Sequence, residues 1–143
     1  MADPQLPSPE PWLTEETRPF WSAAAQGHLV LPRCADCATL VWHPRPFCPR
    51  CRSWDIEWTE LSGRGTVYSF TVNRTGRAEH AAYQQAPTYV LAYVQLAEGP
   101  RILTNIVDID PADVRIDLPV RAVFHPTDGE HALVRFAPGG ATG

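Results

Sequence analysis

Every cysteine of the chain lies in one short segment, where the four form two CxxC pairs. Cys34 and Cys37 make the first pair, and Cys48 and Cys51 make the second, with ten residues between the pairs. Each pair can form a tight turn that points two sulfur atoms at one centre. Two such turns facing each other give the tetrahedron of four thiolates that structural zinc prefers. Because no cysteine is left over, the pattern predicts one structural zinc ion.

Three other uses of these cysteines compete with zinc. Two disulfides require an oxidising compartment, but the stretch Met1–Pro7 is acidic and rich in proline, without the apolar segment of a secretory signal. A redox-active CxxC motif is expected once, at the start of a helix, whereas this chain has two CxxC pairs, which argues against a redox role. Iron in a rubredoxin-like site stays open, because the same four thiolates bind it. We favour zinc, since rubredoxin-type knuckles prefer glycine after the second cysteine and the chain has Ala38 and Arg52 there.

A centre closed by four protein thiolates has no free position for water or substrate, so we expect it to support folding and not catalysis. The position after each second cysteine often needs a positive φ, which alanine and arginine adopt less readily than glycine. The chain has no Gly-x-Ser-x-Gly elbow, no phosphate-binding glycine loop and no HExxH helix. We therefore identify no catalytic residue and expect no activity from the chain by itself.

The composition excludes some classes of partner. The chain has 143 residues, which suits a small metal module followed by one small barrel. Its twelve basic residues are all arginine, its net charge is -4, and no run of five basic residues occurs. An extended nucleic-acid surface is therefore not expected, and the apolar runs are too short to span a membrane. Reduced cysteines and the lack of a signal-like segment favour the cytoplasm.

Residues 1–17 form the first segment of the chain, before the helix and the cysteines. Four prolines alternate with polar residues there, which predicts an extended, flexible arm. Trp12 interrupts this pattern with apolar surface. It either packs on its own domain or anchors the arm on a partner, where a buried aromatic side chain can dominate the binding energy.

A short helix is expected over residues 18–26. Thr17 can cap its start and Gly27 can end it. Phe20 and Trp21 give the helix an apolar face, which contacts either the metal module or a partner.

Two strands are expected to enter and leave the first cysteine turn, over residues 28–33 and 40–43. A strand, a cysteine turn, a strand and a second cysteine turn make up the layout of a zinc ribbon. The helix and the ribbon together form one predicted unit, residues 18–58.

Residues 59–138 are predicted to form a five-stranded barrel. Five runs rich in Val, Ile, Thr, Tyr and Phe are separated by turn residues, with one helical turn over 110–114 between the third and the fourth. This pattern favours an OB-fold, with an SH3-like barrel as the alternative. The fold class is therefore mainly β, and residues 139–143 are expected to be a disordered tail. The five runs cover residues 65–73, 88–96, 101–107, 120–124 and 132–136.

One loop is longer than is usual in a small barrel. Residues 74–87 join the first two barrel strands, and loops of this length are often functional. Arg74 and Arg77 lie in this loop and Arg64 precedes the first strand, so the three could converge at the mouth of the barrel. Arginine binds phosphate through two parallel hydrogen bonds. These three arginines are the predicted residues for binding an anion such as phosphate.

A zinc ribbon followed by an OB barrel allows two classes of function. Nucleic-acid binding is one, with bases stacking on aromatic side chains. The net charge of -4 argues against it. The other class is a small scaffold subunit of an enzyme that handles acyl groups. The aromatic candidates alternate along strands and would fill a barrel core equally well; they are Tyr68, Phe70, Tyr89 and Tyr93.

Several motifs occur in a specific order along the chain. They are Pro19, Phe20, Trp21, Gly27, the two cysteine pairs with Pro44, Pro46 and Pro49, Trp58, and the runs 62–71, 98–107 and 117–121. This order resembles the acyl-CoA-associated OB-fold family with an N-terminal rubredoxin-like zinc ribbon. The resemblance covers nearly the whole chain after Pro19, with departures at Ala38 and Arg52.

The resemblance implies a non-catalytic accessory subunit. Members of the family are partners of thiolase-fold enzymes, or are bound or fused to hotdog-fold enoyl-CoA hydratases. Some pair with a thiolase-like retro-aldolase that shortens steroid side chains as CoA thioesters. By this resemblance the chain holds such an enzyme together in a hetero-oligomer and helps enclose the CoA thioester, and the ribbon and the helix with Phe20 and Trp21 contact the enzyme. Trp12 of the arm is a further candidate contact. On this basis we also expect Arg64, Arg74 and Arg77 to bind the CoA or its phosphates. A nucleic-acid-binding zinc-ribbon protein is the alternative.

Overall fold

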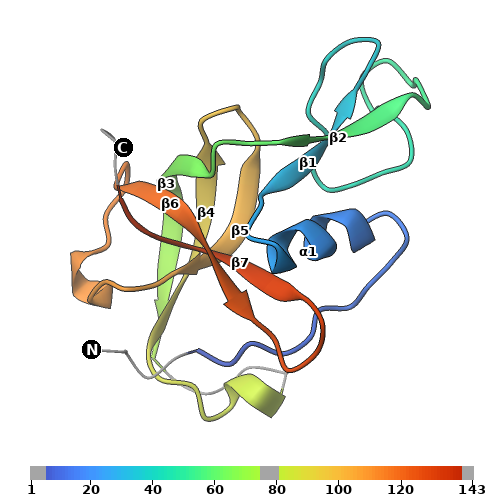
Figure 1. Ribbon diagram of the computed structural model, residues 1–143. Helices are drawn as coiled ribbons and strands as arrows, with labels where there is room; N and C mark the ends of the chain where they lie inside the picture. The colour runs from blue at the N-terminus through green and yellow to red at the C-terminus, as the bar shows by residue number, and fades with distance from the viewer. Residues whose placement is uncertain (1–5, 75–80, 140–143) are drawn as a thin grey trace.

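The computed structural model describes residues 6–74 and 81–139, which form a helix, a two-stranded ribbon and a closed barrel (Figure 1). The helix is α1 (Arg18–Ala25), and the ribbon pairs β1 (Val30–Cys34) with β2 (Ile56–Glu60). In Figure 1 the ribbon projects from one end of the barrel. The barrel strands are β3 (Arg64–Asn73), β4 (Tyr89–Leu96), β5 (Arg101–Ile106), β6 (Pro119–Pro126) and β7 (Ala132–Pro138).

The barrel has the strand order of an OB-fold. Its strands follow one another as β3-β4-β5-β7-β6, and β6 pairs with β3 to close the ring. All neighbours are antiparallel except β5 and β7, which meet in parallel at Ile106 and Phe136. A single 3-10 turn, Pro111–Asp113, lies between β5 and β6, where the Asp110 carboxylate accepts a hydrogen bond from the Ala112 N–H at 2.9 Å. The predicted mainly β class with a five-stranded OB barrel is confirmed.

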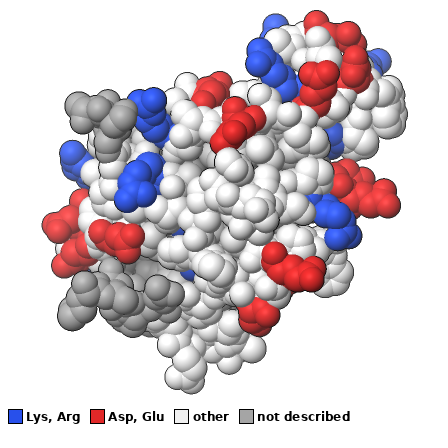
Figure 2. Space-filling view, in the orientation of Figure 1, with Lys and Arg blue, Asp and Glu red and all other residues white. Residues whose placement is uncertain are grey.

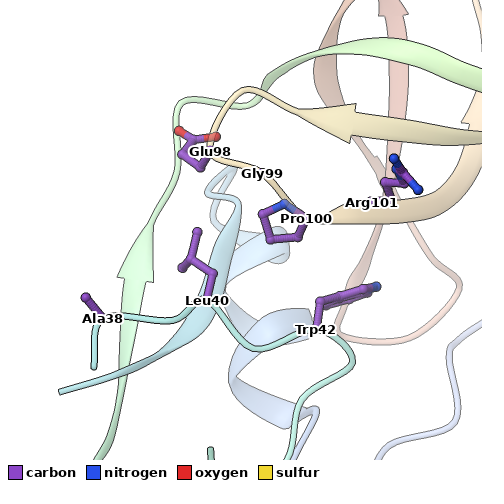
Figure 3. A pocket seen from close by; sticks show the side chains of 7 residues that line it. All are labelled: Ala38, Leu40, Trp42, Glu98, Gly99, Pro100 and Arg101. Carbon is purple, nitrogen blue, oxygen red and sulfur yellow. The ribbon is translucent and has the colours of Figure 1, made fainter. Parts of the chain in front are cut away.

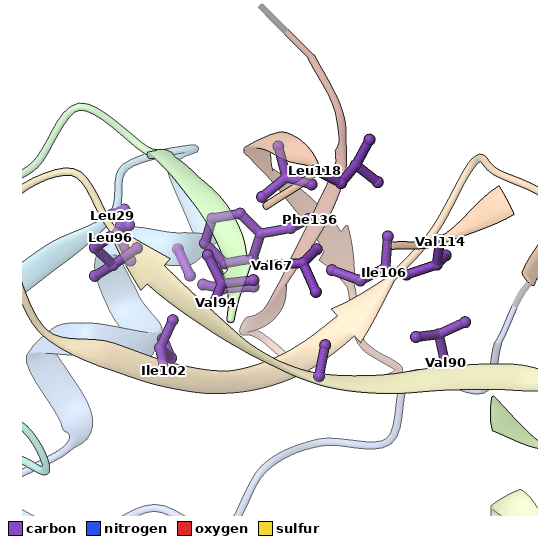
Figure 4. Packing of buried hydrophobic residues seen from close by; sticks show 14 of the residues in the cluster. Leu29, Val67, Val90, Val94, Leu96, Ile102, Ile106, Val114, Leu118 and Phe136 are labelled. Atoms are coloured by element: carbon purple, nitrogen blue, oxygen red, sulfur yellow. The ribbon is translucent and has the colours of Figure 1, made fainter. Parts of the chain in front are cut away.

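One hydrophobic core joins the three parts. Every second side chain of β4 and of β5 is buried in the barrel, as the period of a strand requires. Figure 4 shows apolar side chains from the barrel gathered around Phe136. Phe20 and Ala24 of α1 belong to the same cluster, as do Leu29 and Leu31 at the start of the ribbon. The helix and the ribbon are therefore packed against the barrel and do not form a separate core.

The helix starts differently from the prediction. Thr17 occupies the N-cap position, but its side chain makes no capping hydrogen bond. Its hydroxyl instead accepts a bond from the Thr14 N–H at 3.1 Å, because the residues before the helix already form a turn. Gly27 has a φ of +82°, the left-handed conformation in which glycine commonly ends a helix.

The expected second ribbon strand, residues 40–43, does not form. Leu40 makes a single bridge with Arg33, and Pro44 then offers no N–H to extend a ladder. The partner of β1 is instead β2, in a register that runs from Val30 opposite Glu60 to Cys34 opposite Ile56. The ribbon is thus closed by a segment that follows the second cysteine turn.

The described part of the N-terminal arm, residues 6–17, is held on the barrel through Pro7, Ser8 and Glu10. The Glu10 carboxylate accepts hydrogen bonds from the Thr127 hydroxyl at 2.6 Å and from the N–H groups of Glu130 and His131 at 3.2 and 3.3 Å. It also lies 2.8 Å from the His131 ring nitrogen. One side chain of the arm therefore binds the whole turn between β6 and β7.

A buried arginine fixes the beginning of the arm. Arg135 of β7 is 1% exposed, and its guanidinium donates hydrogen bonds to Ser8 Oγ, the Pro7 carbonyl, Tyr83 Oη and His125 Nδ1. Burial and the Arg135 charge lower the pKa of His125, which keeps the imidazole neutral and able to accept. No carboxylate pairs with Arg135 in the described part of the chain.

The structure contains no helix, among the residues described, that is long and apolar enough to cross a membrane.

The Glu10 contacts predict a pH-dependent arm. The hydrogen bonds from Thr127 and then His131 lower the pKa of Glu10 from 4.5 to about 2. A lowered pKa in the folded state stabilises the docked arm fully above pH 4.5, and this stabilisation is lost as the pH falls from 4.5 toward about 2. The difference in melting temperature between the natural protein and Glu10→Gln should therefore shrink through that range.

Thermal melts between about pH 6 and about pH 2.5 measure this difference. Both proteins carry the same cysteines, so acid loss of the metal affects both. Glu130→Gln is the control, because the carboxylate of Glu130 is exposed and its backbone alone contacts Glu10. A difference that stays constant with pH would show that Glu10 does not hold the arm.

Candidate metal centre and partner surfaces

The four cysteine sulfurs meet where the ribbon is closed. All four Sγ atoms lie within 4.8 Å of one another, with 3.5 Å between Cys34 and Cys51 and 3.6 Å between Cys37 and Cys48. Zinc bonds of about 2.3 Å to four tetrahedral sulfurs place those sulfurs about 3.8 Å apart. The predicted structural zinc site is confirmed: one zinc ion fits all four sulfurs and leaves no position for a substrate.

Each cysteine pair is held by a tight turn. The N–H of Ala38 donates to the Cys34 carbonyl at 2.9 Å, and the N–H of Arg52 donates to the Cys48 carbonyl at 2.8 Å. Ala38 has a φ of 65° and Arg52 a φ of 67°. Both turns therefore place a residue in the left-handed conformation, as expected from the spacing of the cysteines. In Ala38 and Arg52 this conformation is strained, because their Cβ atoms crowd the backbone.

The thiols are not equivalent without a metal. Hydrogen bonds from Thr39, first its hydroxyl and then its N–H, lower the pKa of Cys37 to about 6. At Cys51 a hydrogen bond from the Ser53 N–H lowers the pKa, but the neighbouring thiols and burial raise it to about 12. The negative charge on one thiolate therefore makes ionisation of a neighbouring thiol less favourable. A divalent cation removes this repulsion and allows all four to ionise, as the donor set of a zinc site requires.

The three predicted phosphate-binding arginines do not form one site. Arg64 begins β3 and Arg74 follows its last residue, so ten residues at about 3.3 Å each separate them by roughly 30 Å. Arg77 lies outside the described residues. The expectation that the three converge is therefore wrong for Arg64 and Arg74, because a strand is fully extended.

The aromatic residues of the barrel face in different directions. Tyr68 and Tyr93 are 47% and 46% exposed, so they do not fill the core. Tyr93 pairs across the strands with Leu103, which is 52% exposed, and the guanidinium carbon of Arg101 lies 3.7 Å from the centre of the Tyr68 ring. We call these four residues the outer sheet face. Sequence reasoning missed Arg101, although its spacing from Leu103 places both on one face of β5.

A groove lies between the ribbon and the hairpin that joins β4 to β5. It has a volume of about 410 Å³, and Arg101 extends it toward the outer sheet face. Figure 3 shows Pro100 between Leu40 on one side and Arg101 on the other, with Trp42 below it. We call it the hairpin groove; its lining is Ala38, Leu40, Trp42, Glu98, Gly99, Pro100 and Arg101.

The three predicted partner contacts differ in exposure. Trp12 is 91% exposed, although the arm around it is docked. Phe20 is 3% exposed and belongs to the core, so it is not available to a partner and this prediction is corrected. Trp21 is half-buried, with its ring edge-on to Phe20 at 4.8 Å. The helical periodicity indicated an apolar face but did not show that the same chain covers it.

The charges on the surface are mixed. On the face drawn in Figure 2, acidic and basic side chains surround a wide uncharged centre, without an extended basic stripe. Such a face lacks the excess positive charge with which proteins bind the nucleic-acid backbone.

Comparison with protein-family models matches both parts of the chain. Residues 21–57 match "ChsH2, rubredoxin-like zinc ribbon domain", and residues 58–125 match "ChsH2, C-terminal OB-fold domain". The two ranges meet inside β2.

Several curated proteins are similar in sequence. A "probable enoyl-CoA hydratase alpha subunit" of Thermomonospora curvata is 38% identical over 94% of this chain, which spans only 41% of that relative's length. A "DUF35 domain-containing scaffold protein" of Methanocaldococcus jannaschii is 38% identical over 76% of this chain and 77% of its own. A "benzoylsuccinyl-CoA thiolase subunit BbsA" of Thauera aromatica is 31% identical over 68% of this chain and 66% of its own.

A solved structure shares the whole architecture. A chain of the "Ltp2-ChsH2(DUF35) aldolase" superposes with a TM-score of 0.79 and is 38% identical, over 90% of this chain and 98% of that one.

The metal site predicts one zinc ion per chain. Cys48→Ser should lose the metal and lower the melting temperature strongly, because a structural zinc site contributes on the order of 10 kcal/mol to the folded state. Elemental analysis and thermal melts measure both effects. His43→Ala is the control, since His43 lies between the cysteine pairs but is exposed. Full zinc retention by Cys48→Ser would contradict the four-cysteine site.

The positive φ angles predict two stabilising substitutions. Ala38→Gly and Arg52→Gly should each raise the free energy of unfolding by up to about 1 kcal/mol, because glycine removes the left-handed strain at some entropic cost. Denaturant melts of the zinc-loaded protein, with chelator competition, measure the gain. Ala35→Gly is the matched control, since Ala35 has no positive φ and should be slightly destabilised.

Proposed function

The chain belongs to the ChsH2 family, in which a rubredoxin-like zinc ribbon precedes an OB-fold domain, and on this premise we propose that it is a non-catalytic accessory subunit. It binds and stabilises a thiolase-fold enzyme that acts on acyl-CoA thioesters, in a hetero-oligomer. The similarity to the ChsH2 chain of an aldolase carries the proposal, because it covers nearly that whole chain.

The chemistry of the site supports a role without catalysis. The metal has four protein ligands, so it can neither activate water nor polarise a substrate. The described cysteines are all used by this centre. Relatives described as a scaffold protein and as a thiolase subunit agree with a supporting role.

The surface supplies apolar anchors for a partner. Trp12 is exposed on an arm that is already docked, so its burial by a partner would cost little conformational entropy. We propose Trp12 as a contact, with Trp21 at the edge of the interface. The proposal keeps the division of the chain into four units. They are the arm, the helix with the zinc ribbon, the OB-fold domain and the tail, over residues 1–17, 18–58, 59–138 and 139–143.

Enclosure of the CoA thioester is assigned to the hairpin groove. Leu40, Trp42 and Pro100 offer apolar contacts for a pantetheine chain, and Arg101 offers a cation. Because Arg64 and Arg74 lie at opposite ends of β3, they cannot bind one phosphate together, and each could contact a phosphate only singly.

The proposal also names two candidate partner enzymes. A retro-aldolase of steroid side-chain degradation is the first choice, since the similar ChsH2 chain comes from an aldolase structure. A hotdog-fold enoyl-CoA hydratase is the other, because the Thermomonospora curvata relative is described as a hydratase subunit. We place the complex in the cytoplasm, where the cysteines stay reduced.

Nucleic-acid binding is the second candidate, and one observation favours it. Tyr68 and Tyr93 are exposed on the outer sheet face, on strands of the kind that OB-folds use to bind oligonucleotides. The acidic net charge of -4 opposes it.

Affinity purification from the native cells followed by native mass spectrometry tests the proposal. We expect a thiolase-fold or hydratase subunit in stoichiometric amount, with one zinc ion per small chain. Trp12→Ala should weaken the complex about 30-fold, as the loss of a buried tryptophan anchor does. Trp12 is almost fully exposed, so the variant should fold normally.

Two results would overturn the accessory role. One is a zinc-loaded monomer without any enzyme subunit. The other is co-elution with RNA and binding to heparin, which would assign Tyr68 and Tyr93 to a nucleic-acid surface.

A further inference from the structure

A second groove lies between the zinc ribbon and the turn that leads into α1. It has a volume of about 280 Å³, and its apolar lining includes Trp54, Ile56 and Trp58. Glu15 and Glu16 from the turn before α1 line the same groove, and Arg45 contributes a single positive charge. We call it the acidic groove.

We infer that the acidic groove is a docking site for a segment of the partner subunit that carries apolar side chains and one basic side chain. The inference rests on the proposed function and deepens it, because it names a surface and the chemistry that the surface recognises.

The described residues cover the apolar lining only in part, since Trp58 packs against the core cluster. Trp54 is 72% exposed, and its ring is supported by Phe47 at a centroid distance of 5.5 Å. Trp58 and Ile56 are half-buried beside it. Exposed tryptophan in a supported, concave position is the side chain that most often dominates binding energy at interfaces.

The charges of the groove select the partner. Glu15 and Glu16 are both exposed, and neither carboxylate forms an ion pair among residues 6–74 and 81–139. With Arg45 included, the lining has a net charge of one negative unit. A lysine or arginine on the incoming segment would complement this charge.

The same charges disfavour other occupants. The phosphates of CoA or of a nucleic acid would meet two carboxylates. A second copy of this chain would bring its own acidic groove and a further net charge of -4. A basic, apolar segment of a different protein fits best.

Contacts within the chain hold both walls of the groove before a partner binds. One wall follows the second cysteine turn, in which Cys48 and Cys51 bind the metal with Trp54 three residues beyond. The other wall is the turn in which the hydroxyls of Thr14 and Thr17 lie 3.0 Å apart. Zinc therefore positions a docking surface, and a preformed groove loses little entropy when it is filled.

The test measures the affinity of each purified variant for the thiolase-fold or hydratase subunit identified by co-purification. Trp54→Ala should bind about 30-fold more weakly. The double change Glu15→Gln and Glu16→Gln should slow association several-fold at low salt, with the difference vanishing at about 0.5 M salt. A photo-cross-linking residue in place of Trp54 should mark a partner peptide that contains lysine or arginine.

Matched controls separate this surface from general effects. Ile116→Ala removes an apolar side chain that is 52% exposed elsewhere, and Glu130→Gln removes an exposed carboxylate in the turn between β6 and β7. Both should bind normally. Zinc content and melting temperature of Trp54→Ala should match the natural protein.

The outcomes are distinguishable. If the complex forms and Trp54→Ala binds as tightly as the natural protein, the groove is not the docking site and the proposed function stands. If Trp54→Ala abolishes only self-association, the occupant is a second copy and the inference is wrong. If no enzyme subunit co-purifies, the proposed function fails and the inference fails with it.

Discussion

The four-thiolate centre is the constraint on which the ribbon depends. Between β1 and β2 the chain has few buried apolar side chains, chiefly Val41, so a hydrophobic core cannot hold this segment. The metal replaces that core by tying Cys34 at the end of β1 to the turn before β2. Because the centre is fully closed by protein ligands, its contribution is shape and not chemistry.

The rest of the molecule attaches this metal-held ribbon to the barrel. Phe20 from α1 and Leu31 from β1 enter the barrel's core, so the ribbon cannot swing as an independent module. At the other end of the arm, Arg135 and Glu10 hold residues 6–17 against β7 and the β6–β7 turn. Arg135 is unusual, because its buried guanidinium donates only to neutral acceptors among the described residues, and its Nε has no hydrogen-bond partner there.

The fixed positions of the ribbon and the arm affect how the exposed side chains can bind a partner. Trp12, Trp54 and the outer sheet face are exposed although their surroundings are fixed, which is the condition under which apolar side chains bind partners at low entropic cost. The two grooves beside the ribbon differ in charge: the hairpin groove has Glu98 and Arg101, whereas the acidic groove has Glu15, Glu16 and Arg45. The two grooves therefore differ in the chemistry that they can offer, while both belong to one fold.

Features that depend on short-range spacing could be predicted from the amino-acid sequence. The two CxxC pairs indicated the metal site, runs rich in Val, Ile, Thr, Tyr and Phe between turn residues indicated the barrel strands, and Gly27 marked the end of the helix. These features were predictable because each is fixed by neighbouring residues in the chain. Even the strain at Ala38 and Arg52 followed from the geometry of one turn.

Which faces of the elements are covered depends on long-range packing and became known from the fold. It buried Phe20, separated Arg64 from Arg74 along an extended strand, and gave β1 the distant strand β2 as its partner. It also docked an arm whose composition indicated flexibility, through contacts between residues more than a hundred positions apart. A periodic pattern shows that a face exists, but long-range packing determines whether that face meets the chain itself or remains free for a partner.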